Sequence, residues 1–339
     1  RVQQMSIEET KKLACNFLSE KSRDEVRCRL SAILNGKPNE SLILVFCGTF
    51  SSGKSSLINA LINPTFKLPA GVNPVTKLVT RLKYGRKFEA GYILDGMEYP
   101  LKQSELSKYI NGKLPLPADS KEIVIKLPAE ILKGGVEILD TPGYMDNEEL
   151  TEITRAAVAT ADVAFFCCHA TVAGKKFELD YFEELEECLG NFCVIINHMD
   201  AINYSIENFE KIKNFMEGNI GDRGRAIIHY ITDEKIFYTI ADGNYPDVEK
   251  FKNFMEHICS GLSKKFRRRL QRLSYQKRTM YNLKMMQAKV QAQIQSGDFF
   301  YSCVSEEIES EYQKAKTAYF AKCKEITERM EKIQSDGLK

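Results

Sequence analysis

The sequence lacks several features that define common classes of protein. A transmembrane helix needs about 18 consecutive apolar residues, and no apolar run reaches this length. No N-terminal signal peptide is recognisable. The 48 basic and 46 acidic residues leave a net charge of +2, so no polyanionic partner is indicated and no nucleic acid is expected to bind. The chain begins with Arg1 instead of Met, which we interpret as the mark of a fragment or a processed chain.

The ten cysteines show no spacing typical of a metal site or a disulfide framework. Neither Cys167-Cys168-His169 nor the pair Cys188 and Cys193 has the C-x-x-C spacing of zinc ligands. Several cysteines lie in apolar runs, as is typical of buried thiols in a reducing compartment. We therefore expect a cytoplasmic protein with an ordinary hydrophobic core.

One long motif has a direct chemical meaning. Residues 48–56 read GTFSSGKSS, which fits G-x-x-x-x-G-K-S between the apolar run LILVFC and the helix-like LINALI. Gly48 and Gly53 allow the backbone to wrap around a triphosphate, with the N–H groups of the loop and the following helix directed at its oxygens. Lys54 supplies a charge for the β- and γ-phosphates, and the Ser55 hydroxyl is a candidate Mg²⁺ ligand. The expected nucleotide-binding residues of this loop are Gly48, Phe50, Ser51, Ser52, Gly53, Lys54, Ser55 and Ser56.

Two shorter motifs follow strand-like runs farther along the chain. In DTPG, the Asp140 carboxylate is expected to hold Mg²⁺ through water, and the Gly143 amide to meet the γ-phosphate. Asn197, His198 and Asp200 belong to an N-x-x-D motif, whose carboxylate accepts hydrogen bonds from the N1–H and the exocyclic amine of guanine. Adenine lacks this pair of donors, so the motif favours GTP and argues against the alternative of a P-loop ATPase or kinase.

A threonine between the first two motifs is a candidate sensor of the γ-phosphate. Residues 68–80 read LPAGVNPVTKLVT, and the Thr76 hydroxyl is expected to ligate Mg²⁺ while its amide meets the γ-phosphate. Thr80 is the second candidate; Thr76 is preferred because the chain already reads as a strand from Leu78 onward. The predicted metal ligands are Ser55, Thr76 and Asp140.

The spacing of apolar residues divides the chain into three regions. Helical spacing and two capping boxes predict N-terminal helices over residues 1–36. Residues 37–261 alternate strand and helix signals, which predicts an α/β domain with a mostly parallel sheet and helices on both faces. Residues 262–339 predict two long amphipathic helices that form a hairpin. We expect both chain ends to form one helical bundle beside the α/β domain.

Within the α/β domain, individual elements are predicted by residue range. The predicted helices are 149–160, 177–189, 206–216 and 247–258. The sequence Asp95-Gly96 predicts a hairpin turn between two of the strands given next. The predicted strands are 42–47, 78–84, 88–94, 123–127, 136–139, 163–168, 192–196 and 236–240.

The stretches FCGTFSSGKSSLINALI and LPAGVNPVTKLVTRLKYG, followed by DTPG and N-x-x-D, resemble the dynamin superfamily of large GTPases. Bacterial dynamin-like proteins are closest and mitofusins more distant, and the similarity covers most of residues 40–245. The resemblance implies a GTPase that hydrolyses GTP to GDP and phosphate with Mg²⁺. It also implies a homodimer through the G domains when nucleotide is bound, a helical bundle that moves in membrane remodelling, and peripheral association with the inner membrane surface.

The resemblance further implies roles for individual residues. Ser51 occupies the position at which the family holds the attacking water and a monovalent cation, K⁺ or Na⁺. The preceding position, polar in eukaryotic dynamins, is Phe50, and His198 replaces a lysine whose stem packs on guanine; imidazole can stack there instead. Thr239 and Ala241 lie where relatives close over the base. The implied catalytic residues are Ser51, Lys54, Thr76 and Gly143.

Two alternatives stay open at the level of sequence. Phe50 and His198 also fit a nucleotide-gated scaffold that binds GTP with little hydrolysis. Ten Lys or Arg and no acidic residue lie between Leu262 and Gly297, and such a helix could meet anionic lipid or nucleic acid. A bundle helix that faces a glutamate-rich neighbour is the favoured interpretation. The glutamates in question are Glu306, Glu307, Glu309 and Glu311.

Overall fold

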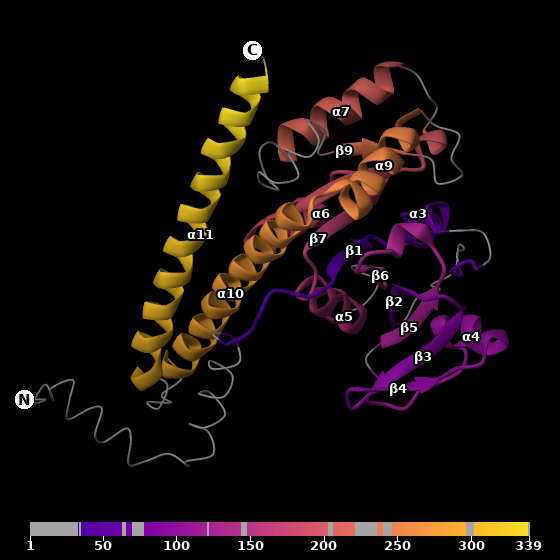
Figure 1. The fold of residues 1–339 in the computed structure, drawn as a ribbon, viewed down its shortest axis with the longest axis horizontal. Coiled ribbons are helices and arrows are strands. Elements are labelled where there is room, and N and C mark those ends of the chain that lie inside the picture. Colours follow the sequence, from indigo (N-terminus) through magenta and orange to yellow (C-terminus); the bar gives the residue numbers. More distant parts are fainter. Residues whose placement is uncertain are drawn as a thin grey trace, which may run out of the picture. The chain divides into compact units, whose positions relative to one another are not determined.

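The chain divides into two compact units. One runs from Asn39 to Ser274, and the other combines Arg1–Pro38 with Tyr275–Lys339. The structure is a computed structural model, and the first unit contains the sheet and the P-loop (Figure 1). The residues that it describes are 33, 35–62, 66–69, 78–120, 122–143, 148–202, 206–220, 236–239, 246–295 and 302–337.

A mixed sheet forms the centre of the first unit (Figure 1). Its strand order is β4-β3-β5-β2-β6-β1-β7-β8-β9. Strand β1 pairs in parallel with β6 and β7, as do β7 with β8, β8 with β9 and β2 with β5. The strands are β1 (Leu42–Gly48), β2 (Val79–Tyr84), β3 (Glu89–Leu94), β4 (Met97–Pro100), β5 (Glu122–Leu127), β6 (Val136–Asp140), β7 (Val163–His169), β8 (Phe192–Asn197) and β9 (Ile236–Tyr238).

The sheet is mixed: the five strand pairs given above are parallel, as predicted for most of the sheet, whereas β2–β6, β3–β4 and β3–β5 are antiparallel. Asp95 and Gly96 have φ values of 51° and 79°, as the two central residues of a tight hairpin turn require. They join β3 to β4, a strand missing from the predicted set because its residues are mostly exposed. The eight strands that were predicted agree with the described ones to within one or two residues at each end.

Helices cover both faces of the sheet. Successive residues of a buried strand point to opposite sides, so a continuous apolar strand places side chains on both faces that must be covered. On one face, the Phe165 ring lies 5.9 Å from that of Phe251 in α9 (Pro246–Glu256). On the other face, the Phe166 ring lies 5.3 Å from that of Tyr181 in α6 (Lys176–Cys188). The helical elements of this unit are α3 (Lys54–Leu61), η1 (Gln103–Glu105), α4 (Leu106–Ile110), η2 (Glu130–Leu132), α5 (Glu148–Val158), α6 (Lys176–Cys188), η3 (Met199–Ala201), α7 (Ile206–Ile220), α9 (Pro246–Glu256) and the π-helical turn η4 (His257–Gly261).

The parallel strands in the middle of the sheet bring their carboxyl ends to one edge. Strand β1 ends at Gly48, β6 at Asp140, β7 at His169 and β8 at Asn197. In open α/β sheets this edge is where ligands bind. The topology therefore gathers the three sequence motifs of the α/β domain in one place.

The second unit contains α11 (Ser302–Gly337) and the part of α10 (Lys264–Gln295) that begins at Tyr275. These helices lie side by side, and Lys277 Nζ lies 4.9 Å from the centre of the Tyr319 ring (Figure 1). The Tyr275 hydroxyl donates a hydrogen bond to the Ile33 carbonyl over 3.2 Å. The helices predicted for residues 1–36 lie almost entirely outside the described residues. No helix in the described part of the chain is long and apolar enough to cross a membrane.

Candidate nucleotide-binding site

The loop after β1 requires glycine at two positions. Gly48 and Gly53 have φ values of 134° and 83°, a region that side chains rarely adopt. A Cβ at Gly48 would lie 2.1 Å from the Cys167 carbonyl oxygen, and one at Gly53 would lie 2.2 Å from Asn197 Nδ2. The loop thus passes directly over the ends of β7 and β8, and nothing larger than glycine fits at either contact.

Helix α3 begins directly after this loop with its amino terminus open. Gly53 is its N-cap residue, no side chain caps the first turn, and the first turn contains no acidic residue. The first N–H groups of a helix have no partner within the helix, and the aligned peptide dipoles place a partial positive charge there. This end of α3 is therefore suited to bind an anion such as phosphate.

Lys54 holds its ammonium group against the loop. The side chain is 7% exposed, and Nζ donates hydrogen bonds to the carbonyl oxygens of Gly48 over 3.1 Å and Thr49 over 2.9 Å. The carbonyl bonds fix a cation beside the backbone that would enclose the phosphates. Ser51 is exposed with a φ of 55°, and Ser56 is half-buried on α3.

Asp140 joins the second motif to the first. The Ser55 hydroxyl donates a hydrogen bond to Asp140 Oδ2 over 2.6 Å, while Asp140 Oδ1 is buried and has no partner among the described residues. Burial raises the pKa of Asp140 to about 6, and the Ser55 bond and Lys54 oppose this rise. The carboxylate is therefore costly to keep charged without a cation nearby.

The Ser55–Asp140 pair fits Mg²⁺. Magnesium prefers hard oxygen ligands and takes only one or two protein groups besides nucleotide and water. A hydroxyl and a buried carboxylate with an unpartnered oxygen supply such a set. No cluster of three or more His, Cys, Asp or Glu suited to a metal occurs in the described ranges.

We expect Asp140→Asn to stabilise the protein when nucleotide and Mg²⁺ are absent. The folded pKa of Asp140 is about 6 instead of 3.8, so the folded chain binds this proton more tightly than the unfolded chain does. Proton binding therefore stabilises the folded state at low pH, and this stabilisation is lost as the pH rises through 6. At pH 7.5 the charged group costs about 2–3 kcal/mol. Urea unfolding in EDTA should show a gain of this size for Asp140→Asn at pH 7.5 and a smaller gain at pH 5. The exposed Asp180→Asn is the matched control. Equal stability of Asp140→Asn and the parent chain at both pH values would contradict this prediction.

Gly143 of the second motif packs on the phosphate loop. A Cβ at Gly143 would lie 2.9 Å from the Cα of Phe50, so only glycine allows this approach. The Thr141 hydroxyl donates a hydrogen bond to the Phe46 carbonyl over 3.0 Å and fixes the start of the segment on β1. Phe50 itself is 36% exposed and adds an aromatic side chain to the surface at this edge.

The third motif is tied to the same loop by Asn197. Its side chain is fully buried, and Nδ2 donates a hydrogen bond to the Ser52 carbonyl over 3.0 Å. The Thr239 hydroxyl donates to Asn197 Oδ1 over 3.1 Å, so this threonine positions the asparagine. Asp200 lies on η3 and is exposed.

Two histidines, His169 and His198, lie beside the hydrogen bond between Asn197 and Ser52, and only His198 was predicted as a site residue. His198 has a left-handed φ of 59°, and its Nε2 lies 3.1 Å from where a Gly53 Cβ would be. Its ring stacks on His169, with the ring centres 4.4 Å apart and the planes 17° apart. The signal for His169 in the sequence is its place as a polar residue at the end of a buried strand.

Two predicted site residues, Thr76 and Ala241, lie outside the described residues. Thr80, the second candidate for the γ-phosphate sensor, is fully buried in β2 and lies opposite Asp140 in the antiparallel pair with β6. Its side chain thus belongs to the sheet interior, next to the candidate magnesium ligand.

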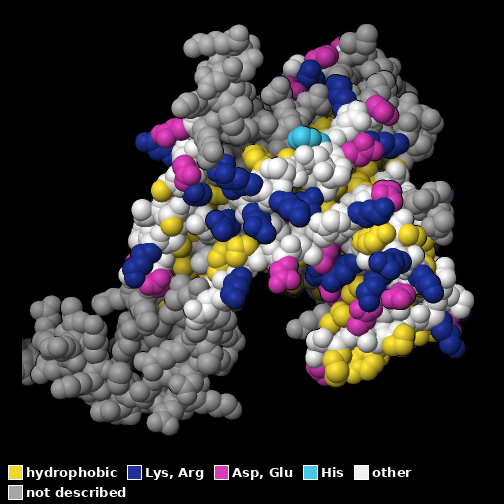
Figure 2. All heavy atoms as spheres, in the orientation of Figure 1, with side chains coloured by type: hydrophobic (Ala, Val, Ile, Leu, Met, Phe, Trp, Pro, Cys, Tyr) yellow, Lys and Arg dark blue, Asp and Glu magenta, His cyan; other side chains and the backbone are white. Residues whose placement is uncertain are grey.

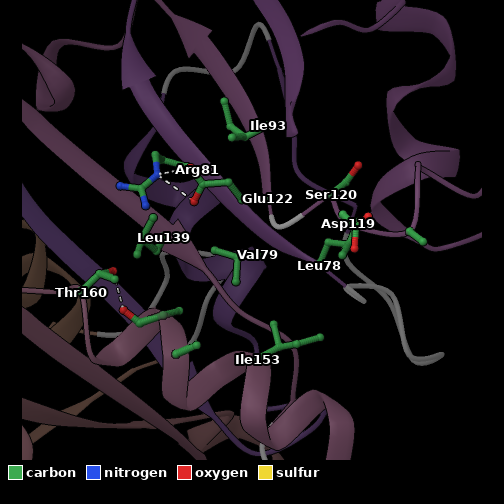
Figure 3. Close-up of a pocket in the computed structure, with 13 residues that line it drawn as sticks. Leu78, Val79, Arg81, Ile93, Asp119, Ser120, Glu122, Leu139, Ile153 and Thr160 are labelled. Atoms are coloured by element: carbon green, nitrogen blue, oxygen red, sulfur yellow. Dashed lines mark hydrogen bonds and ion pairs between the residues drawn. The ribbon is translucent and has the colours of Figure 1, made fainter. Parts of the chain in front are cut away.

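A separate cavity of about 640 Å³ lies between the sheet and α5 (Figure 3). Val79 and Arg81 of β2, Leu139 of β6 and Ile153 of α5 line it. Arg81 Nε donates hydrogen bonds to both carboxylate oxygens of Glu122 over 2.9 and 3.0 Å. None of the described lining residues belongs to the three nucleotide motifs.

The fold and the site define a P-loop nucleotide-binding domain. Residues 44–200 match the profile of the dynamin family.

Individual relatives agree with this match. The chain is 28% identical over 218 residues to a bacterial dynamin-like protein of Nostoc punctiforme, a match that covers 57% of this chain and 31% of the relative. It is 30% identical over 179 residues to dynamin-like protein 2 of Campylobacter jejuni, with 52% of this chain and 29% of the relative covered. The chain thus spans less than a third of the length of either relative.

A solved structure of an oligomerised bacterial dynamin pair has a similar fold. It matches with a TM-score of 0.53 and 19% sequence identity, over 81% of this chain and 41% of the other. At this level of identity the likeness concerns the fold alone.

Proposed function

We propose that this chain is a dynamin-type GTPase that hydrolyses GTP to GDP and phosphate. The observation that carries the proposal is the meeting of Lys54, the Ser55–Asp140 pair and the Asn197 side chain at one edge of the sheet. A cation, a hard-oxygen pair and a base-recognition motif at this spacing are the parts that phosphoryl transfer from a nucleotide requires.

The phosphates would be held by the loop and α3. Lys54 and the N–H groups at the start of α3 would neutralise the β- and γ-phosphates, and the Gly143 amide would meet the γ-phosphate. Ser55 and, through water, Asp140 would hold Mg²⁺ together with Thr76. When bound, this ion neutralises charge that develops on the phosphate oxygens. Ser51 would orient the attacking water, with a monovalent cation beside it.

The base would be held by the third motif. The Asp200 carboxylate would accept hydrogen bonds from the N1–H and amine of guanine, and the tie between Asn197 and Ser52 would hold this segment at the right distance from the phosphates. His198 would pack against the base, and Thr239 and Ala241 would contribute the segment that closes over it. With adenine the Asp200 carboxylate would lack these two hydrogen bonds, which would lower the affinity for ATP, so GTP would be selected.

Phosphate release tests this proposal. With Mg²⁺ and K⁺, the chain should release phosphate from GTP at least about 100-fold faster than from ATP. EDTA should abolish the activity. Equal turnover of the two nucleotides, or turnover that persists in EDTA, would overturn the proposal.

The alternative function is a nucleotide-gated scaffold that binds GTP with little hydrolysis. The exposed aromatic ring of Phe50, which cannot orient a water molecule, is the observation that favours it. The two functions differ in how the turnover per molecule depends on protein concentration. A rise in specific activity with concentration supports the GTPase, whereas tight GTP binding with no turnover at high concentration supports the scaffold.

We further propose that GTP drives dimerisation through the G domains, residues 37–261, and that this moves a bundle built from residues 1–36 and 262–339. The hydrogen bond between Tyr275 and Ile33 supports a contact between the two ends of the chain. Light scattering after size exclusion should give a monomer without nucleotide and with GDP, and a dimer with GDP and aluminium fluoride. A monomer under all three conditions would contradict the dimerisation.

Membrane remodelling is proposed as the outcome, with peripheral association of a cytoplasmic protein. The bacterial dynamin pair of similar fold is described as sensing and tethering membranes. Figure 2 shows Lys and Arg side chains gathered over α10. Four basic residues of this helix are exposed and form no ion pair with any described residue. These residues are Lys264, Lys265, Arg268 and Arg272. Co-sedimentation with anionic but not neutral vesicles is the expected result; no binding to either would contradict it.

A further inference from the structure

His169 is held in one orientation by the segment that follows it. The Thr171 backbone N–H donates to His169 Nδ1 over 3.3 Å, and the Thr171 hydroxyl lies 2.9 Å from the same atom. Because Nδ1 accepts the backbone N–H, it carries no hydrogen, and the hydrogen of the neutral ring lies on Nε2. The contact with Thr171 thus fixes both the orientation and the tautomer of His169.

The neutral His169 ring supports one face of His198. The rings stack at 4.4 Å, and His198 in turn lies against Gly53 of the phosphate loop. The Nε2 atom of His198 is buried and has no hydrogen-bond partner among the described residues. His198 is also held in a left-handed backbone conformation. It directly follows Asn197, whose side chain donates a hydrogen bond to the Ser52 carbonyl, and it lies two residues before Asp200.

From this geometry we infer that His169 is a positioning residue for guanine-nucleotide binding, and that it acts in its neutral form by holding the His198 ring at the base side of the phosphate loop. The inference rests on the proposed function and assigns a new residue to the same site. Protonation at Nδ1 would remove the hydrogen bond from Thr171 and would place a positive charge against a second imidazole. Acidification should therefore release the His198 ring and weaken nucleotide binding.

The charges around the pair agree with a neutral ring at physiological pH. The groups that act on His169 are His198, stacked on it, and Asp200 on η3. Burial and His198 lower the pKa of His169 below its usual 6.5, and Asp200 opposes them without reversing the shift.

The test is equilibrium binding of a fluorescent GDP analogue in EDTA, which removes the contribution of Asp140 as a magnesium ligand. At pH 7.5, His169→Ala should raise the Kd about fivefold, as expected for the loss of one aromatic contact. His169→Phe keeps a flat ring and should bind within about twofold of the parent chain. Between pH 7.5 and 5.5, the parent chain should weaken about fivefold and His169→Phe much less. His257→Phe, on the exposed turn η4, is the matched control and should follow the parent chain at both pH values.

The outcomes separate this inference from the proposed function. If the parent chain binds GDP and His169→Ala binds equally well, His169 does not position the site and only the inference fails. If His169→Phe shows the same pH dependence as the parent chain, proton linkage through His169 is wrong. If the parent chain binds no guanine nucleotide at either pH, the proposed function fails and the inference falls with it.

Discussion

Lys54→Ala should lower GTP turnover by at least about 100-fold, the largest effect expected from any single substitution in this chain. The lysine is nearly buried, and its ammonium group is held by two carbonyl oxygens of the loop that would surround the phosphates. Charge on the phosphate oxygens grows in the transition state, and alanine leaves it without this cation. Phosphate release under saturating GTP measures the effect.

A matched control shows whether the effect comes from the cation at this site or from the removal of any lysine. Lys108 is exposed on α4, away from the three motifs, and Lys108→Ala should keep full activity. Lys54→Ala should also give the same urea unfolding curve as the parent chain, because its loop remains anchored through Asn197 and Ser52. Undiminished turnover by a folded Lys54→Ala chain would contradict the role given to this residue.

Asp200→Asn should weaken GTP binding about 100-fold and confer binding of xanthosine triphosphate. The substitution exchanges one acceptor oxygen for an amide donor at nearly constant size. The new amide N–H donor then faces the amine of guanine, which is also a donor. Neither group finds an acceptor, and unpaired polar groups of this kind lower the affinity. Xanthine carries a carbonyl where guanine carries the amine, so it can accept the new hydrogen bond. Competition binding with both nucleotides measures the exchange.

The gain of a second ligand makes this test independent of folding. A variant that merely unfolds would bind neither nucleotide, whereas the predicted variant binds one and loses the other. Asp180→Asn, an exposed position on α6, should leave both affinities unchanged. If Asp200→Asn keeps its preference for GTP, the base is not read by this carboxylate.

The sequence predicts most of the sheet because its strands are buried and bounded by strong signals. Every residue of β1 is buried, and its continuous apolar run is typical of a central parallel strand. Strand β4 was not predicted because it lies at the edge of the sheet and is mostly exposed. Its residues therefore show no alternation of apolar and polar side chains. The pairing of β2 with β6 in antiparallel orientation also depends on contacts between distant segments, which local patterns do not encode.

The candidate site divides in the same way. The residues of GTFSSGKSS, DTPG and N-x-x-D are predictable because the spacing within each motif is local. The stack between His169 and His198 is not, because it depends on the register of β7 and β8, in which His169 lies opposite Asn197. The contact of Gly143 with Phe50 likewise appears only when the ends of β6 and β1 are brought together.

The most direct test of the central claim is displacement of a fluorescent guanine nucleotide at equilibrium by unlabelled GTP and by ATP, with Mg²⁺ present. If the site described at the carboxyl ends of β1, β6 and β8 reads guanine through Asp200, GTP should compete at a concentration at least about 100-fold lower than ATP. Displacement by both nucleotides at the same concentration would contradict it.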